Sequence, residues 1–363
     1  MIFHPDVPND NGFLTSLDQL KDLFTRHGCR QRFKGNTPEE LQAWQAESRV
    51  ILKNIFGFDT FEPCDNKVIE LERTDLPDHT RFKYVLQTEE KVYVPFFVLI
   101  PADLKAGEKR PAVICPNGHF ARAKESVAAV REEENVLKDI DEFNLAYGED
   151  FVKMGYIAFC PDARGFGERA EKARQAEGEW KCTCTHLNRM GIPLGRSALG
   201  MCIWDLVKLT DYITTRDDCD SSRIGCGGLS GGGMQSMYLA AVDERIKCVC
   251  TSGYFYGALE SLLTMNENCD CNYVPNMWKH FDMGDIAAMI APRPLIIETG
   301  EKDPLNGESG INNITPQLEI AQKAYSVTNC DTKIIHVVFD AGHAWGGHET
   351  YPFFERYLPV GQS

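Results

Sequence analysis

The spacing of hydrophobic positions along the chain changes near residue 60. Before that point, apolar residues recur every three or four positions over residues 14–24 and 39–56, which is the spacing of amphipathic helices. Thr37-Pro38-Glu39-Glu40 provides a cap, a proline at the first helical position and acids in the first turn of the second helix. The pattern predicts a helical N-terminal extension over residues 1–60.

Beyond residue 60 the pattern becomes that of β-strands. Stretches rich in β-branched and aromatic residues cover residues 67–73, 81–87 and 92–100. From residue 111, short apolar runs alternate with segments long enough for crossover helices. These runs are residues 112–115, 157–160, 224–227, 248–251, 295–298 and 334–339. Repeated β-α units predict an α/β fold, with a mainly parallel central sheet, helices on both faces and one domain over residues 61–363.

Residues 168–200 fit no strand or helix of this alternation. The segment contains charged residues, Trp180, a cysteine pair and the turn-prone sequence Gly191-Ile-Pro-Leu-Gly195. We interpret it as an insertion near the mouth of the site, where it would act as a lid that shapes substrate entry.

Composition excludes several classes of partner. The chain has 363 residues, 53 of them acidic and 38 basic, and its net charge of −15 argues against nucleic acid and anionic membranes as partners. The N-terminus lacks the basic and apolar regions of a secretory signal, and no stretch reaches the roughly 18 apolar residues of a membrane span. These features predict a cytoplasmic protein, in which the 14 cysteines are expected to be reduced thiols.

Two cysteine pairs, Cys182-Thr-Cys184 and Cys269-Asp-Cys271, have a one-residue gap. Structural zinc sites usually use two-residue gaps, so ordinary buried or surface thiols are the preferred interpretation. A thiol- or zinc-dependent role remains the weaker alternative. We therefore predict neither a metal nor an organic cofactor.

A glycine-rich turn supplies the candidate nucleophile. Gly228-x-Ser230-x-Gly232 follows the run 224–227 and precedes a helical stretch over residues 234–241. A serine on such a sharp strand-to-helix turn is exposed above the sheet, and the glycines let the strand and the helix approach closely. A phosphate-binding loop is the alternative, but no lysine follows these glycines as a P-loop requires.

A serine hydroxyl needs a base and an orienting acid, and both follow at later strand ends. Asp303 lies beyond the run 295–298, and His343 lies just after the run 334–339, which gives the chain order serine, acid, histidine used by this class of fold. His348 and His119 are alternatives for the base. Glu298, Glu301 and Glu260 are alternatives for the acid.

Acyl transfer also needs donors for the oxyanion of the tetrahedral intermediate. We expect the backbone N–H of Gly231 at the start of the helix, and that of His119 in the loop Pro116-Asn-Gly-His119, although a plain Asn-Gly turn also explains this loop. Trp345 and Tyr254 lie just past strand ends and are candidate substrate contacts, with packing as the alternative. Asp162 and Arg164 are expected to form an ion pair that braces neighbouring loops.

From about residue 92 to His343 the sequence resembles the bacterial α/β-hydrolases described as acetyl xylan esterase-like or dienelactone hydrolase-like. The segments that carry the resemblance are Asn117-Gly-His, Asp162-Ala-Arg-Gly-Phe-Gly, Gly228-Leu-Ser-Gly-Gly, Ser252-Gly-Tyr-Phe, Cys271-Asn-Tyr-Val-Pro, Asp282-Met-Gly-Asp-Ile, Ala291-Pro-Arg-Pro-Leu and Ala341-Gly-His. The resemblance implies a serine hydrolase acting on short acyl esters, often acetyl groups on sugars, through Ser230, Asp303 and His343. Asn117 departs from the histidine that many hydrolases have before this glycine. Ser230 departs from the cysteine nucleophile of a true dienelactone hydrolase.

Together these features predict a serine carboxylesterase of the α/β-hydrolase fold that forms an acyl-enzyme on Ser230. Its substrate would be a small-molecule ester, such as an acetylated saccharide, and nothing in the sequence decides whether the protein is a homo-oligomer. A peptidase or an acyltransferase on the same scaffold is an alternative, because fold and triad do not fix the acceptor. A non-catalytic binding module is another, although such modules usually lack a triad member.

Overall fold

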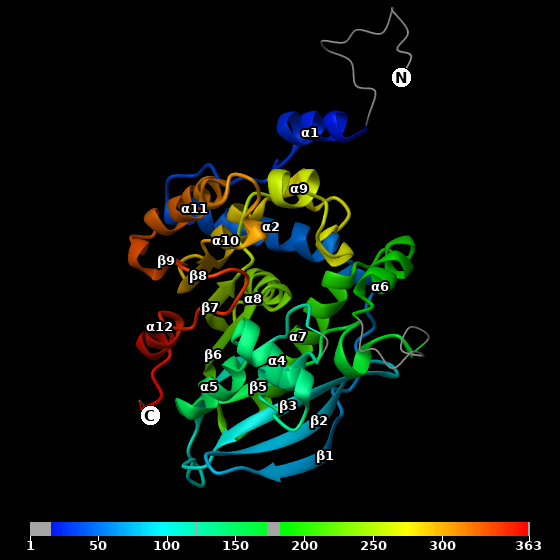
Figure 1. Ribbon diagram of the computed structural model, residues 1–363. Coiled ribbons are helices and arrows are strands. Elements are labelled where there is room, and N and C mark those ends of the chain that lie inside the picture. The colour runs from blue at the N-terminus through cyan, green and yellow to red at the C-terminus, as the bar shows by residue number, and fades with distance from the viewer. Residues whose placement is uncertain (1–15, 121, 173–181, 362–363) are drawn as a thin grey trace, which may run out of the picture.

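The protein is described by a computed structural model over residues 16–120, 122–172 and 182–361 (Figure 1). The two predicted N-terminal helices are present as α1 (Ser16–His27) and α2 (Pro38–Ile55). Residues 14–15 of the first prediction lie outside the described residues. The predicted start of α2 is confirmed: the Thr37 hydroxyl accepts the Glu40 N–H at 3.2 Å, and the Glu40 carboxylate accepts the Thr37 N–H at 3.2 Å.

The central sheet has nine strands and contains all nine predicted runs. The strands are β1 (Val68–Asp75), β2 (His79–Glu89), β3 (Val92–Pro101), β4 (Arg110–Ile114), β5 (Ile157–Pro161), β6 (Cys219–Leu229), β7 (Ile246–Ser252), β8 (Leu295–Gly300) and β9 (Ile334–Phe339). Their order is β1-β2-β3-β5-β4-β6-β7-β8-β9. The pairs from β1 to β5 through β2 and β3 are antiparallel, and all pairs from β5 to β9 are parallel. The α/β-hydrolase fold predicted from the sequence is confirmed.

Helices cover both faces of this sheet. They are α3 (Lys124–Val127), α4 (Glu134–Phe143), α5 (Tyr147–Lys153), α6 (Cys184–Gly191), α7 (Ala198–Thr215), α8 (Gly231–Val242), α9 (Met277–His280), α10 (Met283–Ile290), α11 (Ile311–Ser326) and α12 (Thr350–Tyr357). Among the helices of the described residues, none is long and apolar enough to cross a membrane.

Strand β4 shows how the core divides between the two faces. Ala112 and Ile114 belong to the larger hydrophobic cluster, which includes side chains of α2, α7, α8, α10 and α11. Val113 and Cys115 belong to a second cluster with side chains of α5 and α12. Because successive strand residues point to opposite faces, an uninterrupted apolar run is what a strand covered on both sides requires.

The N-terminal extension is tied into the larger of these two layers. The Gln45 side-chain amide of α2 donates to the carbonyls of Ala288 and Ala291 at 3.1 and 2.6 Å, at the end of α10. Arg49 donates to the carbonyl of Ala241 at the end of α8 at 3.1 Å. Helix α1, by contrast, buries none of its residues and lies beside α9 at the top of Figure 1.

Candidate active site

Ser230 occupies the sharp turn between β6 and α8. Its backbone is at φ 60°, ψ −122°, a conformation that L-residues rarely adopt, and its N–H donates to the Ser252 carbonyl at 2.8 Å. A Cβ atom at Gly228 would lie 2.8 Å from the Pro116 carbonyl oxygen, and one at Gly232 would meet the same oxygen. Only glycine fits at these two positions, so the motif Gly228-x-Ser230-x-Gly232 is explained by local packing.

Asp303 and His343 meet at the carboxyl ends of β8 and β9. The His343 Nδ1 lies 2.6 Å from the Asp303 Oδ2, while the Asp303 Oδ1 accepts the Leu305 N–H at 2.9 Å. The Asp303 side chain is buried, whereas that of His343 is partly exposed. Gly253, at φ 58°, supports the imidazole from below, because a Cβ there would lie 3.1 Å from the His343 Cε1.

The alternatives considered for the base and the acid lie elsewhere. The His348 side chain is 92% exposed and pairs with Glu349. Glu260 accepts the Ser309 N–H at 2.5 Å, and Glu301 is exposed. Glu298 is buried under the His343 loop, where it accepts the Gly347 N–H at 2.9 Å and the Thr350 hydroxyl at 2.7 Å.

A cavity of about 260 Å³ joins several of the predicted residues. Its lining consists of His119, Ser230, Gly231, Tyr254, Tyr256, Glu267, Asn268, Cys269, Asn272, Leu305 and His343. A larger cavity of about 630 Å³ lies between α1 and α9 and is lined by none of the predicted site residues. The smaller cavity is therefore the candidate active site.

The loop that carries His119 is braced from three directions. The Pro116 carbonyl accepts the Tyr147 hydroxyl at 2.6 Å, the Asn117 carbonyl accepts the Gln235 side-chain amide at 2.9 Å, and the Asn117 Oδ1 accepts the Ala163 N–H at 2.9 Å. Asn117, which departs from the histidine of many hydrolases, thus serves as a structural bridge.

The His119 ring lies between the serine turn and a cysteine-rich region. A Cβ at Gly231 would lie 2.7 Å from the His119 Nδ1, and the His119 ring packs edge-on against Phe166 with centroids 5.2 Å apart. Burial, together with the nearby His343, lowers the pKa of His119 to about 4, so its imidazole is neutral at pH 7.

Two expectations about packing need correction. Trp345 is buried, stacks on Tyr147 with centroids 4.7 Å apart and donates to the Tyr351 hydroxyl at 3.1 Å. It is not among the residues that line the cavity, which favours the packing interpretation over a substrate contact. Tyr254, by contrast, does line the cavity.

The expected ion pair between Asp162 and Arg164 is wrong. Asp162 pairs with the Lys124 ammonium at 2.7 Å, and Arg164 pairs with Asp205 at 2.8 Å and Glu89 at 2.7 Å. The bracing role is nevertheless fulfilled, because each residue ties this loop to a different element. Adjacent residues of a loop after a strand point in different directions, and sequence spacing does not reveal which distant charges they meet.

Sequence reasoning missed Tyr256, which shares a loop with Tyr254 and lines the cavity. Its hydroxyl is buried and has no hydrogen-bond partner among the described residues. The available signal was its position, two residues beyond Tyr254 and close after the run 248–251. An unpaired buried hydroxyl in a cavity wall is a group that a ligand can satisfy.

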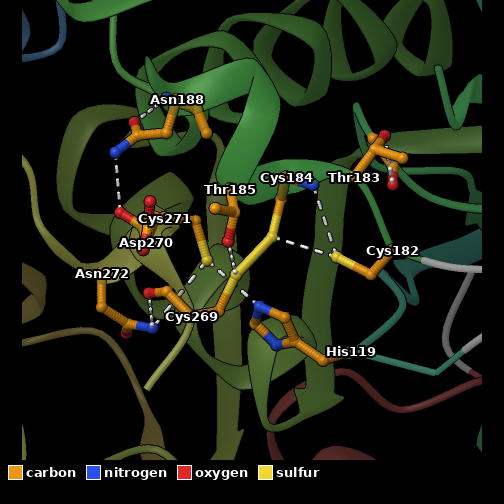
Figure 2. The surroundings of a disulfide bond; sticks show 12 residues. His119, Cys182, Thr183, Cys184, Thr185, Asn188, Cys269, Asp270, Cys271 and Asn272 are labelled. Atoms are coloured by element: carbon orange, nitrogen blue, oxygen red, sulfur yellow. Dashed lines mark hydrogen bonds between the residues drawn. A yellow bond between two sulfur atoms is a disulfide. The ribbon is translucent and has the colours of Figure 1, made fainter. Parts of the chain in front are cut away.

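The four cysteines of the two pairs converge beside His119 (Figure 2). In the structure a disulfide joins Cys184 and Cys269, which differs from the expectation that all cysteines are reduced. The fold brings together segments about 85 residues apart, a meeting that the spacing within each pair does not indicate. The part of residues 168–200 that the structure describes contributes Cys184 at the start of α6, while Trp180 lies outside the described residues.

Solved structures share this architecture at low sequence identity. A provisionally assigned acetyl xylan esterase from Bacteroides fragilis NCTC 9343 superimposes with a TM-score of 0.76 and 22% identity, over 98% of this chain and 92% of that one. The methylesterase BT1017 superimposes with a TM-score of 0.67 and 18% identity, over 95% of this chain and 67% of that one. These likenesses establish the fold.

Sequence comparison identifies the family. YtaP of Bacillus subtilis (strain 168), itself provisionally assigned as a hydrolase, is 28% identical over 255 residues, which are 68% of this chain and 79% of YtaP. Residues 9–314, which include α1, α2 and Ser230, match the model of the Abhydrolase_7 abhydrolase family. The chain therefore belongs to this family of α/β-hydrolases.

Proposed function

We propose that the protein is a serine carboxylesterase that hydrolyses short-chain acyl esters through an acyl-enzyme on Ser230. The observation that carries the proposal is the hydrogen bond of 2.6 Å between Asp303 and His343 at a cavity that Ser230 also lines. A histidine oriented by a buried carboxylate beside a serine on a strained turn is the arrangement that activates a hydroxyl as a nucleophile.

In the first half-reaction, the His343 Nε2 takes the proton of the Ser230 hydroxyl as its oxygen attacks the ester carbonyl. Asp303 holds the proton on the Nδ1 of His343 and stabilises the imidazolium that forms. His343 then gives its proton to the leaving alcohol. In the second half-reaction, the same imidazole activates a water molecule, which releases the carboxylic acid and restores Ser230.

The oxyanion of each tetrahedral intermediate would be held by the backbone N–H groups of Gly231 and His119. Gly231 is the first residue of α8, so its N–H has no acceptor within the helix, and the helix dipole favours negative charge there. The brace on Pro116 and Asn117 fixes the second donor before substrate binds, and such preorganisation is what makes these donors effective.

The size and polarity of the cavity support a small ester. Ligand pockets usually span about 300–1,000 Å³, so a cavity of about 260 Å³ favours a short acyl group over a long lipid chain. Asn268, Asn272, Tyr254 and Tyr256 in its wall offer hydrogen bonds that suit a polar alcohol such as a sugar. An acetylated saccharide combines both properties, as the resemblance to acetyl xylan esterases implies.

The direct test is hydrolysis of p-nitrophenyl acetate, butyrate and octanoate by the wild type, Ser230→Ala and the matched control Ser222→Ala on the exposed part of β6. We expect activity that falls from acetate to octanoate, loss of activity in Ser230→Ala, and wild-type rates in Ser222→Ala. A fluorophosphonate probe should add its mass to the peptide containing Ser230. Equal rates in Ser230→Ala and the wild type would refute the proposal.

A second measurement separates the two sides of the ester. The superimposed structures include an acetyl xylan esterase and a methylesterase, which differ in whether the small group is the acid or the alcohol. Acetylated xylo-oligosaccharides should release acetate, whereas methyl-esterified uronic acid oligosaccharides should release little methanol. Faster release of methanol would assign the sugar to the acyl side instead.

A further inference from the structure

Four potential metal ligands converge on one wall of the cavity. The side-chain ligand atoms of His119, Cys184, Cys269 and Cys271 all lie within 4.8 Å of one another. They come from the loop after β4, the first residue of α6, and the segment around η6 (Asp270–Asn272). Figure 2 shows the imidazole directed toward the sulfurs, with its Nε2 3.1 Å from the Cys271 Sγ.

We propose that these four residues bind one zinc ion. Three thiolates and one imidazole form a ligand set typical of structural zinc, and the soft sulfurs disfavour magnesium and calcium. Two sulfurs on a tetrahedral zinc lie about 3.8 Å apart, because each Zn–S bond is about 2.3 Å long. Atoms gathered within 4.8 Å therefore need only small side-chain movements to surround one ion.

The surroundings fit thiolates rather than isolated thiols. The Asn272 side-chain amide donates to the Cys271 Sγ at 3.8 Å, and the Thr185 hydroxyl lies 3.9 Å from the Cys269 Sγ. Cys184 is the first residue of α6, where the helix dipole favours negative charge. Outer groups of this kind orient the ligands of metal sites. A small cavity of about 10 Å³ also touches His119, Cys184 and Cys271.

The backbone separation favours shared coordination over a permanent disulfide. The Cα atoms of Cys184 and Cys269 are 7.4 Å apart, beyond the range of about 4.4–6.8 Å at which cysteines are usually bridged. Starting from the bonded pair, a dithiol reductant supplies two electrons and two protons, breaks the S–S bond and itself becomes a disulfide. Zinc then displaces the protons of the three thiols, and no further electron is transferred.

Such an ion would join the insertion to the loop that carries a proposed oxyanion donor. Cys184 belongs to the 168–200 segment, while the ring of His119 lies next to Gly231. Holding the imidazole through Nε2 fixes the position of the His119 backbone as well. The zinc would thus act as a positioning element for the esterase proposed above, although its binding does not depend on that activity.

The experiment measures zinc in the full-length protein, expressed with added zinc and purified with a thiol reductant. Mass spectrometry of the metal should find about one zinc per wild-type chain. Cys184→Ser and Cys271→Ser should lose it. Cys330→Ser, far from the cluster, should retain it, and so should Cys182→Ser, whose sulfur lies 3.0 Å from the Cys184 Sγ but outside the group of four.

Replacement by Co²⁺ makes the result independent of whether the variants fold. The reduced wild type should show thiolate-to-cobalt charge transfer and the intense visible bands of tetrahedral cobalt, and these should disappear when zinc is added. A reduced wild type that binds neither ion would overturn the proposal. So would a Cys271→Ser variant that retains the zinc, or a Cys184–Cys269 disulfide mapped in protein from reducing cytosol that takes up no metal after reduction.

Discussion

Two sides of the active-site cavity are held in place by different means. On one side, Asp303 and His343 lie at the ends of neighbouring parallel strands and meet through a hydrogen bond of 2.6 Å. On the other, His119 and the cysteines lie on loops that the sheet does not order, and they meet through contacts between sulfur and imidazole. The sheet positions the proposed chemistry, whereas long-range contacts between loops position the wall that faces it.

The difference teaches that the two sides can fail separately. Damage to the strand side should remove the chemical step and leave the fold and the metal content unchanged. Damage to the loop side should affect stability, metal content and substrate affinity before it affects proton transfer. Each of the following changes tests one side of this division, from the largest expected effect to the smallest.

Asp303→Asn should lower kcat for p-nitrophenyl acetate by about 10⁴-fold, because the amide cannot hold the proton of His343 on Nδ1. The melting temperature and the zinc content should stay within error of the wild type. His348→Gln, an exposed histidine five residues from His343, is the control and should change kcat less than twofold. A similar loss in both variants would mean that the base has been misassigned.

Asp205→Asn should destabilise the fold by about 3–5 kcal/mol, since it leaves Arg164 and Arg169 without their shared buried carboxylate. Urea unfolding at pH 7 measures the loss. The pH dependence provides a second readout. Burial alone would raise the pKa of Asp205, but the two guanidiniums outweigh it and hold that pKa well below its ordinary value of 3.8.

The sign of this pH effect follows from the lowered pKa. The stabilisation by Asp205 is fully present above the unfolded-state pKa and is lost as the pH falls through the folded-state pKa. The difference in unfolding free energy between the wild type and Asp205→Asn should therefore be constant from pH 5 to 8 and shrink below about pH 4. A difference that grows on acidification would contradict the assignment.

Removal of zinc from the reduced wild type by a chelator should lower kcat/KM by about 10- to 100-fold, the range seen when supporting groups of a site are lost. Restoring zinc should restore the rate. Because the ion positions the His119 loop and does not take part in proton transfer, the pH at half-maximal kcat should not move. A shifted pH profile would place the metal in the chemical step instead.

Tyr256→Phe should raise KM for an acetylated saccharide by about 3- to 10-fold with little change in kcat, because a single hydrogen bond contributes about 0.5–1.5 kcal/mol. With p-nitrophenyl acetate, whose leaving group lacks the sugar hydroxyls, KM should barely change. Equal effects on both substrates would show that the hydroxyl supports the wall of the cavity rather than the sugar.

Strand periodicity and chain order were enough to predict most of the sheet side. The apolar runs correspond to the nine strands, since a strand buried on both faces needs an uninterrupted hydrophobic sequence. Ser230, Asp303 and His343 could be chosen because parallel strands end at the same edge of the sheet, where their following loops meet. Their catalytic roles remain predictions.

The loop side could not be predicted in the same way. Each cysteine pair considered by itself has the wrong spacing for zinc, and only the fold places Cys184 beside Cys269 and Cys271. Arg164 finds Asp205 on α7 and Glu89 on β2, and Trp345 finds Tyr147 on α5. These partners are far apart in the sequence, and no local period records such meetings.

The backbone at Ser230 links the history of such a protein to its thermodynamics. A residue other than glycine at φ 60°, ψ −122° costs of the order of 1–3 kcal/mol, which the rest of the fold must offset. Selection for stability alone would favour glycine at this position, since it adopts the same backbone without strain. A lineage that keeps serine there forgoes a readily accessible stabilising mutation in every generation, so its persistence would itself be a record of selection for activity.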